Sequence, residues 1–183
     1  MSSPALHFEN FENPQPERCL LSEKPRLTLQ QAFTVMAQTI PPQGAITFAR
    51  NDEGIAARIH PFAGHYEPLL SFQFHAAHSS VIIRRIHAGE QKHIGLGSAL
   101  IASQLPFWQQ MGVQEIGLLA HGMSEGFYKK LGFARVHRLP EYSWPRQSVA
   151  LPMRLDLRHT TQRKMFENAL AKAPPLSGFP SPL

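Results

Sequence analysis

The 183 residues hold a single cysteine, Cys19. One cysteine cannot form an internal disulfide, and it excludes a metal cluster built from four cysteines. No apolar run approaches the roughly 20 residues that a membrane-spanning helix needs. The first residues have neither the apolar core of a signal peptide nor the Arg-rich face of a transit peptide. We therefore expect a cytoplasmic protein that has no membrane partner.

Acidic residues are also scarce, since 13 Asp and Glu stand against 18 Lys and Arg and give a formal net charge of +5. A charge of this sign suits an anionic partner or an anionic cofactor. The basic residues do not form one dense run, because pairs such as Arg84-Arg85 and Lys129-Lys130 are scattered along the chain. We therefore expect no nucleic-acid partner, with a tRNA as the one exception that stays open.

The composition, 43% hydrophobic and 17% charged, is typical of a soluble globular chain, and its length fits one domain. Residues 1–24 are rich in Pro, Ser, Asn and Glu and predict a peripheral or poorly ordered lead-in. Residues 25–160 carry the patterned domain. Residues 161–183 predict a short helix and a Pro-rich tail, in which we expect residues 174–183 to be disordered.

Hydrophobic periodicity alternates between strand and helix along the domain. A first helix is expected from Thr28, which forms a capping box with Gln31. A later helix is expected to stop at Gly112, with a kink or an early end at Pro106. A third, over residues 124–131, should end with Gly132 in the left-handed conformation. The predicted strands are 45–49, 55–59, 69–74, 80–86, 115–120, 134–136 and 149–155.

The segment from Lys92 to Ser98 contains Gly95-Leu96-Gly97 between a strand pattern and a helix pattern. Glycines at such a turn let consecutive backbone N–H groups point at one spot, which the helix N-terminus makes electropositive. The segment is therefore a candidate phosphate site, and a plain turn is the alternative. A Rossmann fingerprint fits poorly, because Leu100 replaces its third glycine and no acid ends the next strand.

This loop and the segment Phe127–Phe133, which follows after one helix and one strand, together resemble the GNAT superfamily of N-acetyltransferases. The resemblance covers residues 28–157. It implies an α/β (α+β) fold, with a mixed, mostly antiparallel central sheet that is flanked by helices and splayed between the fourth and fifth core strands. The chain departs from the family at Lys92, at residues 87–91 and at His121.

The resemblance implies acetyl-CoA as the cofactor and direct attack of a primary amine on it in a ternary complex. A backbone N–H near Ile86 or His87 would polarise the thioester carbonyl. Tyr128 would protonate the leaving thiolate as a general acid, although its ring could instead pack in the core. The implied coenzyme A contacts are Ile86, His87, Lys92, His93, Ile94, Gly95, Leu96, Gly97, Ser98, His121 and Tyr128.

An alkylammonium must lose a proton before it attacks, and no carboxylate lies on the strand that ends at Ile86. A relay through water stays open, and the candidate bases are Glu67, His75, His78 and His121. We expect no metal, because the paired histidines lack further ligands at suitable spacing. Between the last two strands, an acceptor-binding wall or a plain cover of the sheet could be formed by Glu141, Tyr142 and Trp144.

The acceptor amine could belong to a small molecule or to a protein, and homodimers are common in the family. The alternative function is a GNAT-like module that binds coenzyme A, or a partner, without turnover. Tyr128 favours the enzyme, whereas the lack of an obvious base and the presence of Lys92 keep the alternative open.

Overall fold

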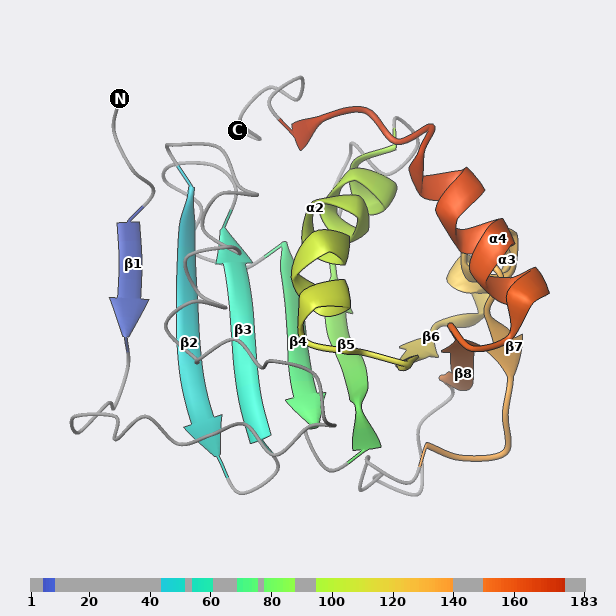
Figure 1. Cartoon of the computed structure of the whole chain (residues 1–183), viewed down its shortest axis with the longest axis horizontal. Helices are drawn as coiled ribbons and strands as arrows, with labels where there is room; N and C mark the ends of the chain where they lie inside the picture. Colours follow the sequence, from blue (N-terminus) through green and yellow to red (C-terminus); the bar gives the residue numbers. More distant parts are fainter. Residues whose placement is uncertain are drawn as a thin grey trace.

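The structure is a computed structural model that describes residues 5–8, 44–51, 54–60, 69–75, 78–87, 95–139 and 150–176. Its strands are β1 (Ala5–Phe8), β2 (Ala45–Asn51), β3 (Gly54–His60), β4 (Leu70–His75), β5 (Ser80–Ile86), β6 (Glu115–Ala120), β7 (Ala134–Arg135) and β8 (Leu151–Asp156). They form one sheet in the order β1-β2-β3-β4-β5-β6-β8-β7 (Figure 1). Neighbouring strands are antiparallel, except for the parallel pairs β1–β2 and β5–β6. The predicted mixed, mostly antiparallel sheet is confirmed.

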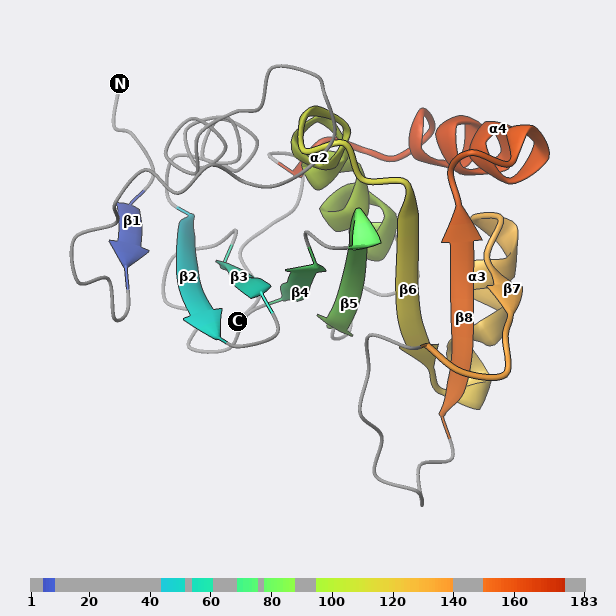
Figure 2. The same ribbon diagram turned by 60° about the horizontal axis from the view of Figure 1, so that its bottom comes forward.

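In the described residues after β5 there are four helical segments, namely α2 (Leu96–Gln110), η3 (Gly122–Ser124), α3 (Glu125–Lys130) and α4 (Thr160–Leu170). Helix α2 lies over β4 and β5, and α4 packs against β8, α2 and α3 (Figures 1 and 2). The ring of Trp108 on α2 meets Phe72 of β4 edge to face, with ring centroids 5.4 Å apart. One face of the sheet therefore packs against α2 and forms one side of the hydrophobic core.

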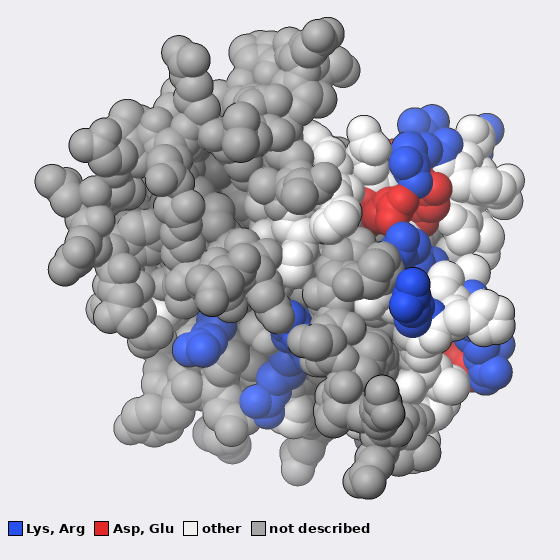
Figure 3. Space-filling view, turned by 90° about the horizontal axis from the view of Figure 1, so that it is seen from below, with Lys and Arg blue, Asp and Glu red and all other residues white. Residues whose placement is uncertain are grey.

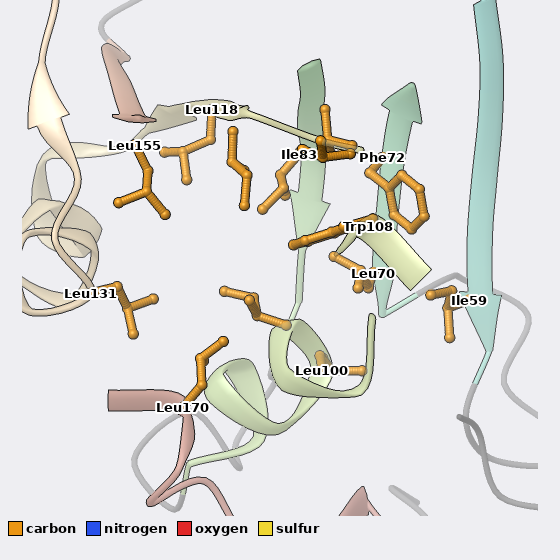
Figure 4. Close-up of a cluster of buried hydrophobic side chains, with 14 of the residues drawn as sticks. Ile59, Leu70, Phe72, Ile83, Leu100, Trp108, Leu118, Leu131, Leu155 and Leu170 are labelled. Carbon is orange, nitrogen blue, oxygen red and sulfur yellow. The ribbon is translucent and has the colours of Figure 1, made fainter. Parts of the chain in front are cut away.

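The core side chains come from the sheet, α2, α3 and α4 (Figure 4). Burying one large apolar side chain contributes about 1.5–3 kcal/mol. On α2 the apolar residues Leu96, Leu100 and Phe107 are buried, as is Met111 directly after the helix. No helix in the described part of the chain has the length and apolar content needed to cross a membrane.

Helix α2 continues through Pro106 to Gln110, so an early end at that proline is wrong. A proline in a helix interior costs about 3 kcal/mol, because it removes a hydrogen bond. Pro106 is exposed, whereas Leu100 and Trp108 on either side of it are fully buried. The packing of these anchors outweighs the local cost.

The strand β1 was not predicted. It lies inside the expected lead-in and pairs in parallel with β2, from Ala5 with Ala45 to Phe8 with Phe48. Four residues are too few to show the alternation of a strand, and the pairing partner lies forty residues along the chain. The remaining seven strands agree with the predicted ones to within two residues at each end.

Strands β5 and β6 pair only over their first halves, from Ser80 with Glu115 to Ile83 with Leu118. Beyond that point β5 continues to Ile86 beside β4, and β6 continues to Ala120 beside β8. The two strands therefore part at their carboxyl ends. This is the predicted splay between the fourth and fifth core strands, which is confirmed.

Candidate functional site

The glycine turn, the end of β5 and the helix α3 meet where β5 and β6 part. A Cβ atom placed on Gly97 would lie 3.4 Å from the Phe127 ring and 3.7 Å from Cγ2 of Ile86. Gly97 is the second residue of α2, Ile86 ends β5, and Phe127 belongs to α3. The structure thus brings together the two segments on which the family resemblance was based, and it adds the end of β5 to them.

The turn itself forms the N-terminus of α2. Gly95 is the N-cap of α2 with a φ of 93°, a left-handed conformation that favours glycine. Its carbonyl accepts a 3.0 Å hydrogen bond from the N–H of Ala99. The earlier amides, those of residues 96–98, have no partner within the helix. They lie at the electropositive end of α2, where a phosphate is stabilised.

The end of β5 offers one backbone donor to the gap between the parted strands. The N–H of His87 donates to the carbonyl of Leu69 at 2.8 Å and is therefore engaged on the β4 side. Successive amides of a strand point to opposite edges. The N–H of Ile86 consequently faces the edge of β5 that is no longer paired with β6. The sequence had suggested Ile86 or His87 as the donor, and of these two only the N–H of Ile86 faces the gap.

Tyr128 lies on α3, next to Phe127. Its ring is 8% exposed and makes edge contacts with Phe127 and Phe133, with centroids 5.0 and 5.8 Å apart. Burial raises the pKa of the Tyr128 hydroxyl from 10.0 to about 12. The side chain therefore packs in the core and also keeps its proton at neutral pH, which suits an acid rather than a base.

The structure separates the described base candidates. His75 is buried at the end of β4 and pairs with Ser80, at the opposite end of β5 from Ile86. The five residue-to-residue steps from Leu70 to His75 span roughly 17 Å of strand. His78 is exposed at the same far end. His121 is exposed directly after β6, at the end of the sheet where the strands part, and among the described candidates only His121 lies at that end.

Several predicted residues lie outside the described ranges, as does the helix expected from Thr28. For the coenzyme A loop these are Lys92, His93 and Ile94; for the base and the acceptor wall they are Glu67, Glu141, Tyr142 and Trp144. Within the described residues no group of three or more His, Cys, Asp and Glu side chains could hold a metal ion.

The segment after α4 was missed as a neighbour of the turn. A Cβ atom on Gly95 would lie 3.2 Å from Cδ of Pro174, and Leu176 is only 6% exposed in the core. Figure 1 shows this segment passing the start of α2. The expectation of disorder is therefore wrong for residues 174–176. The prolines of this segment had suggested disorder, whereas its apolar residue Leu176 is the one that packs into the core.

An ion-pair cluster fixes α3 beside the last strands. Arg135 of β7 donates to both carboxylate oxygens of Glu125 at 2.5 and 2.6 Å, and Lys129 lies 2.8 Å away. These partners, Arg135 first, lower the pKa of Glu125 from 4.5 to about 2. The carboxylate begins the helix that carries Tyr128, so the cluster holds the site's aromatic side in place.

We expect this cluster to make the stability of the folded protein depend on pH in the acidic range. Because the pKa of Glu125 is lowered on folding, its contribution is full above about pH 4.5 and is lost as the pH falls towards 2. The difference in unfolding midpoint between the native chain and Glu125→Gln should shrink over that range. Glu167→Gln, which removes an exposed carboxylate 4.0 Å from Arg163, is the control. A difference that stays constant with pH would contradict the prediction.

No protein-family model and no curated protein matches this chain. Solved structures do match it. GCN5 from Tetrahymena is 18% identical over 57% of this chain and 68% of its own, with a TM-score of 0.41. The PaiA N-acetyltransferase from Thermoplasma acidophilum, solved with coenzyme A, is 16% identical over 55% of this chain and 59% of its own, with a TM-score of 0.39. A variant of the spermidine N-acetyltransferase SpeG from Vibrio cholerae is 15% identical over 62% and 70%, with a TM-score of 0.43.

The splayed sheet beside a glycine turn is the arrangement that the resemblance in the sequence implied. At the identities and TM-scores above, however, the likeness to these structures does not extend to substrate or to residue roles.

Proposed function

We propose that the chain is an N-acetyltransferase that moves an acetyl group from acetyl-CoA to a primary amine. The contact of Gly97 with Ile86 and Phe127 supports this proposal, because it lies where β5 and β6 part. The N-terminus of α2, the unpaired edge of β5 and the helix α3, which carries the buried Tyr128, meet at that point. Together they supply an anion site, a backbone donor and a proton donor.

The pyrophosphate of coenzyme A fits the start of α2. The amides of residues 96–98 would donate to its oxygens, and Lys92 would add positive charge from the preceding loop. The small size of Gly97 lets the ring of Phe127 pack directly against the first turn of α2, since a Cβ there would already lie 3.4 Å from the ring. The extended arm of the cofactor would then lie between the parted edges of β5 and β6, which are not paired with each other there.

The reaction needs one bond made and one bond broken. The amine nitrogen attacks the thioester carbonyl carbon while the N–H of Ile86 donates to the carbonyl oxygen as it gains charge. The carbon–sulfur bond breaks, and the thiolate takes the proton of the Tyr128 hydroxyl, which solvent restores. The ammonium proton leaves to His121 or to water, since His121 is the described base candidate at this end of the sheet.

Release of free thiol from acetyl-CoA, measured over a panel of primary amines, tests the proposal. We expect release that depends on the amine and saturates with its concentration. Calorimetric titration with coenzyme A should show binding whatever the acceptor. Binding without release for any amine would replace the enzyme with a coenzyme A-binding module. Failure to bind coenzyme A would reject both readings.

A further inference from the structure

Two arginines and a serine lie in one row across three adjacent strands. Arg58 of β3 is in register with Ser71 of β4, and Ser71 is in register with Arg85 of β5. Partners in register project to the same face of a sheet, and neighbouring strands are about 4.8 Å apart. The Cα atoms of Arg58 and Arg85 are therefore about 10 Å apart, with the serine between them. Both arginines are exposed.

A bulge in β5 adds a third arginine to the row. The pairing shifts so that Ser71 faces Arg85 but Phe72 faces Ile83, which leaves Arg84 as the extra residue. In a regular strand Arg84 and Arg85 would point to opposite faces, but both are exposed here. Arg84 donates at 2.8 Å to Oε1 of Gln73, a residue of β4 that is only 3% exposed.

Gln73 and Ser71 are two residues apart on β4 and so lie on the same face. The hydrogen bond of Arg84 to Gln73 therefore places Arg84 on the face that holds Arg58 and Arg85. We name these three residues the arginine face. Because the buried Gln73 holds the guanidinium of Arg84 in place, the arginine face is partly ordered before any ligand binds.

The arginine face is the side of the sheet away from α2. The alternate residues of the same strands, among them Ile59, Leu70 and Phe72, belong to the core beneath α2 (Figure 4). Figure 3 shows basic side chains in its lower middle without acidic ones beside them, whereas basic and acidic side chains lie together at its right. The two β5 arginines also come directly after Ile83, the last residue of β5 that pairs with β6.

We propose that the arginine face binds an anionic group, a carboxylate or a phosphate, on the acceptor amine. This inference rests on the acetyltransferase function proposed above. A guanidinium presents two parallel N–H donors to such a group, and the Ser71 hydroxyl adds a third donor within the row. The cofactor's own pyrophosphate has its site at the start of α2, across the sheet. The anion therefore belongs to the molecule that reaches the thioester from the opposite face.

Pairs of amines that differ only in the anionic group test this inference. Phosphoethanolamine is compared with ethanolamine, and L-phenylalanine with L-phenylalaninamide, so that a phosphate and a carboxylate are probed separately. We expect kcat/KM at least about tenfold higher for the anionic member of one pair, because hydrogen bonds to charged groups are the strong ones. Arg85→Gln should remove that preference mainly through KM, and Arg85→Lys should restore part of it.

Arg163→Gln removes the same charge from the outer face of α4 and serves as the matched control, with the preference unchanged. Equal use of both members in both pairs would overturn the inference, as would an equal loss of all four amines in Arg85→Gln. If no amine releases thiol, the acetyltransferase proposal fails separately. Calorimetric binding of the same four amines to the coenzyme A-loaded protein then decides: a preference lost in Arg85→Gln supports the arginine face, and equal affinities reject it.

Discussion

Replacing Tyr128 by phenylalanine should lower kcat of the proposed acetyl transfer by about 100-fold, the usual worth of a placed general acid. Phenylalanine keeps the ring contacts with Phe127 and Phe133, which need no hydroxyl. The unfolding midpoint should therefore change little, and coenzyme A should still bind. The leaving thiolate would lack its proton donor, so the loss should appear in kcat rather than in KM for the cofactor.

The pH profile adds a second readout for the same variant. Because burial raises the pKa of Tyr128 to about 12, the hydroxyl should stay protonated across the range in which the enzyme can be assayed. The native chain should then show no fall in kcat from tyrosine ionisation below about pH 11. A Tyr128→Phe variant with native kcat would show that this side chain serves the core alone. Phe133→Leu, which alters a ring that packs on Tyr128 without removing the hydroxyl, is the matched control.

The elements that sequence patterns predicted are those whose signal is local. Strand β5 is rich in β-branched residues between turn residues, and its predicted bounds match the observed ones. The glycine stops of α2 and α3 were predicted because a left-handed residue after a helix favours glycine, and Gly112 and Gly132 have φ values of 69° and 90°. The splay followed from the family resemblance, which depended on two short motifs at a set distance.

The features that were missed depend on contacts between distant segments. In the sequence, the run Ile83-Arg84-Arg85-Ile86 looks like a strand in which apolar and polar residues alternate, apart from the two adjacent arginines. Only the pairing with β4 shows that Arg84 is the extra residue of a bulge. The place of Pro174 on Gly95 joins residues nearly eighty positions apart. Likewise, Pro106 was expected to end a helix that tertiary packing maintains. In each case a long-range contact outweighs the local preference.

Replacing Gly132 by alanine should lower the free energy of unfolding by about 2–4 kcal/mol, the sum of a left-handed backbone and an overpacked contact. Gly132 follows α3 in a Schellman arrangement, in which the N–H of Phe133 bonds to the carbonyl of Tyr128 and that of Gly132 to Lys129. A Cβ there would lie 2.9 Å from the backbone carbonyl oxygen of Gln162 in α4, which cannot move without its helix.

Gly112 gives a matched control for the size of that collision. It follows α2 in the same arrangement with a φ of 69°, but a Cβ on it would meet nothing within 4 Å. Gly112→Ala should therefore cost only the left-handed strain, about 1–2 kcal/mol. Chemical denaturation of both variants measures the difference. If both cost the same, α4 does not press on the end of α3, and the position of Tyr128 does not depend on that contact.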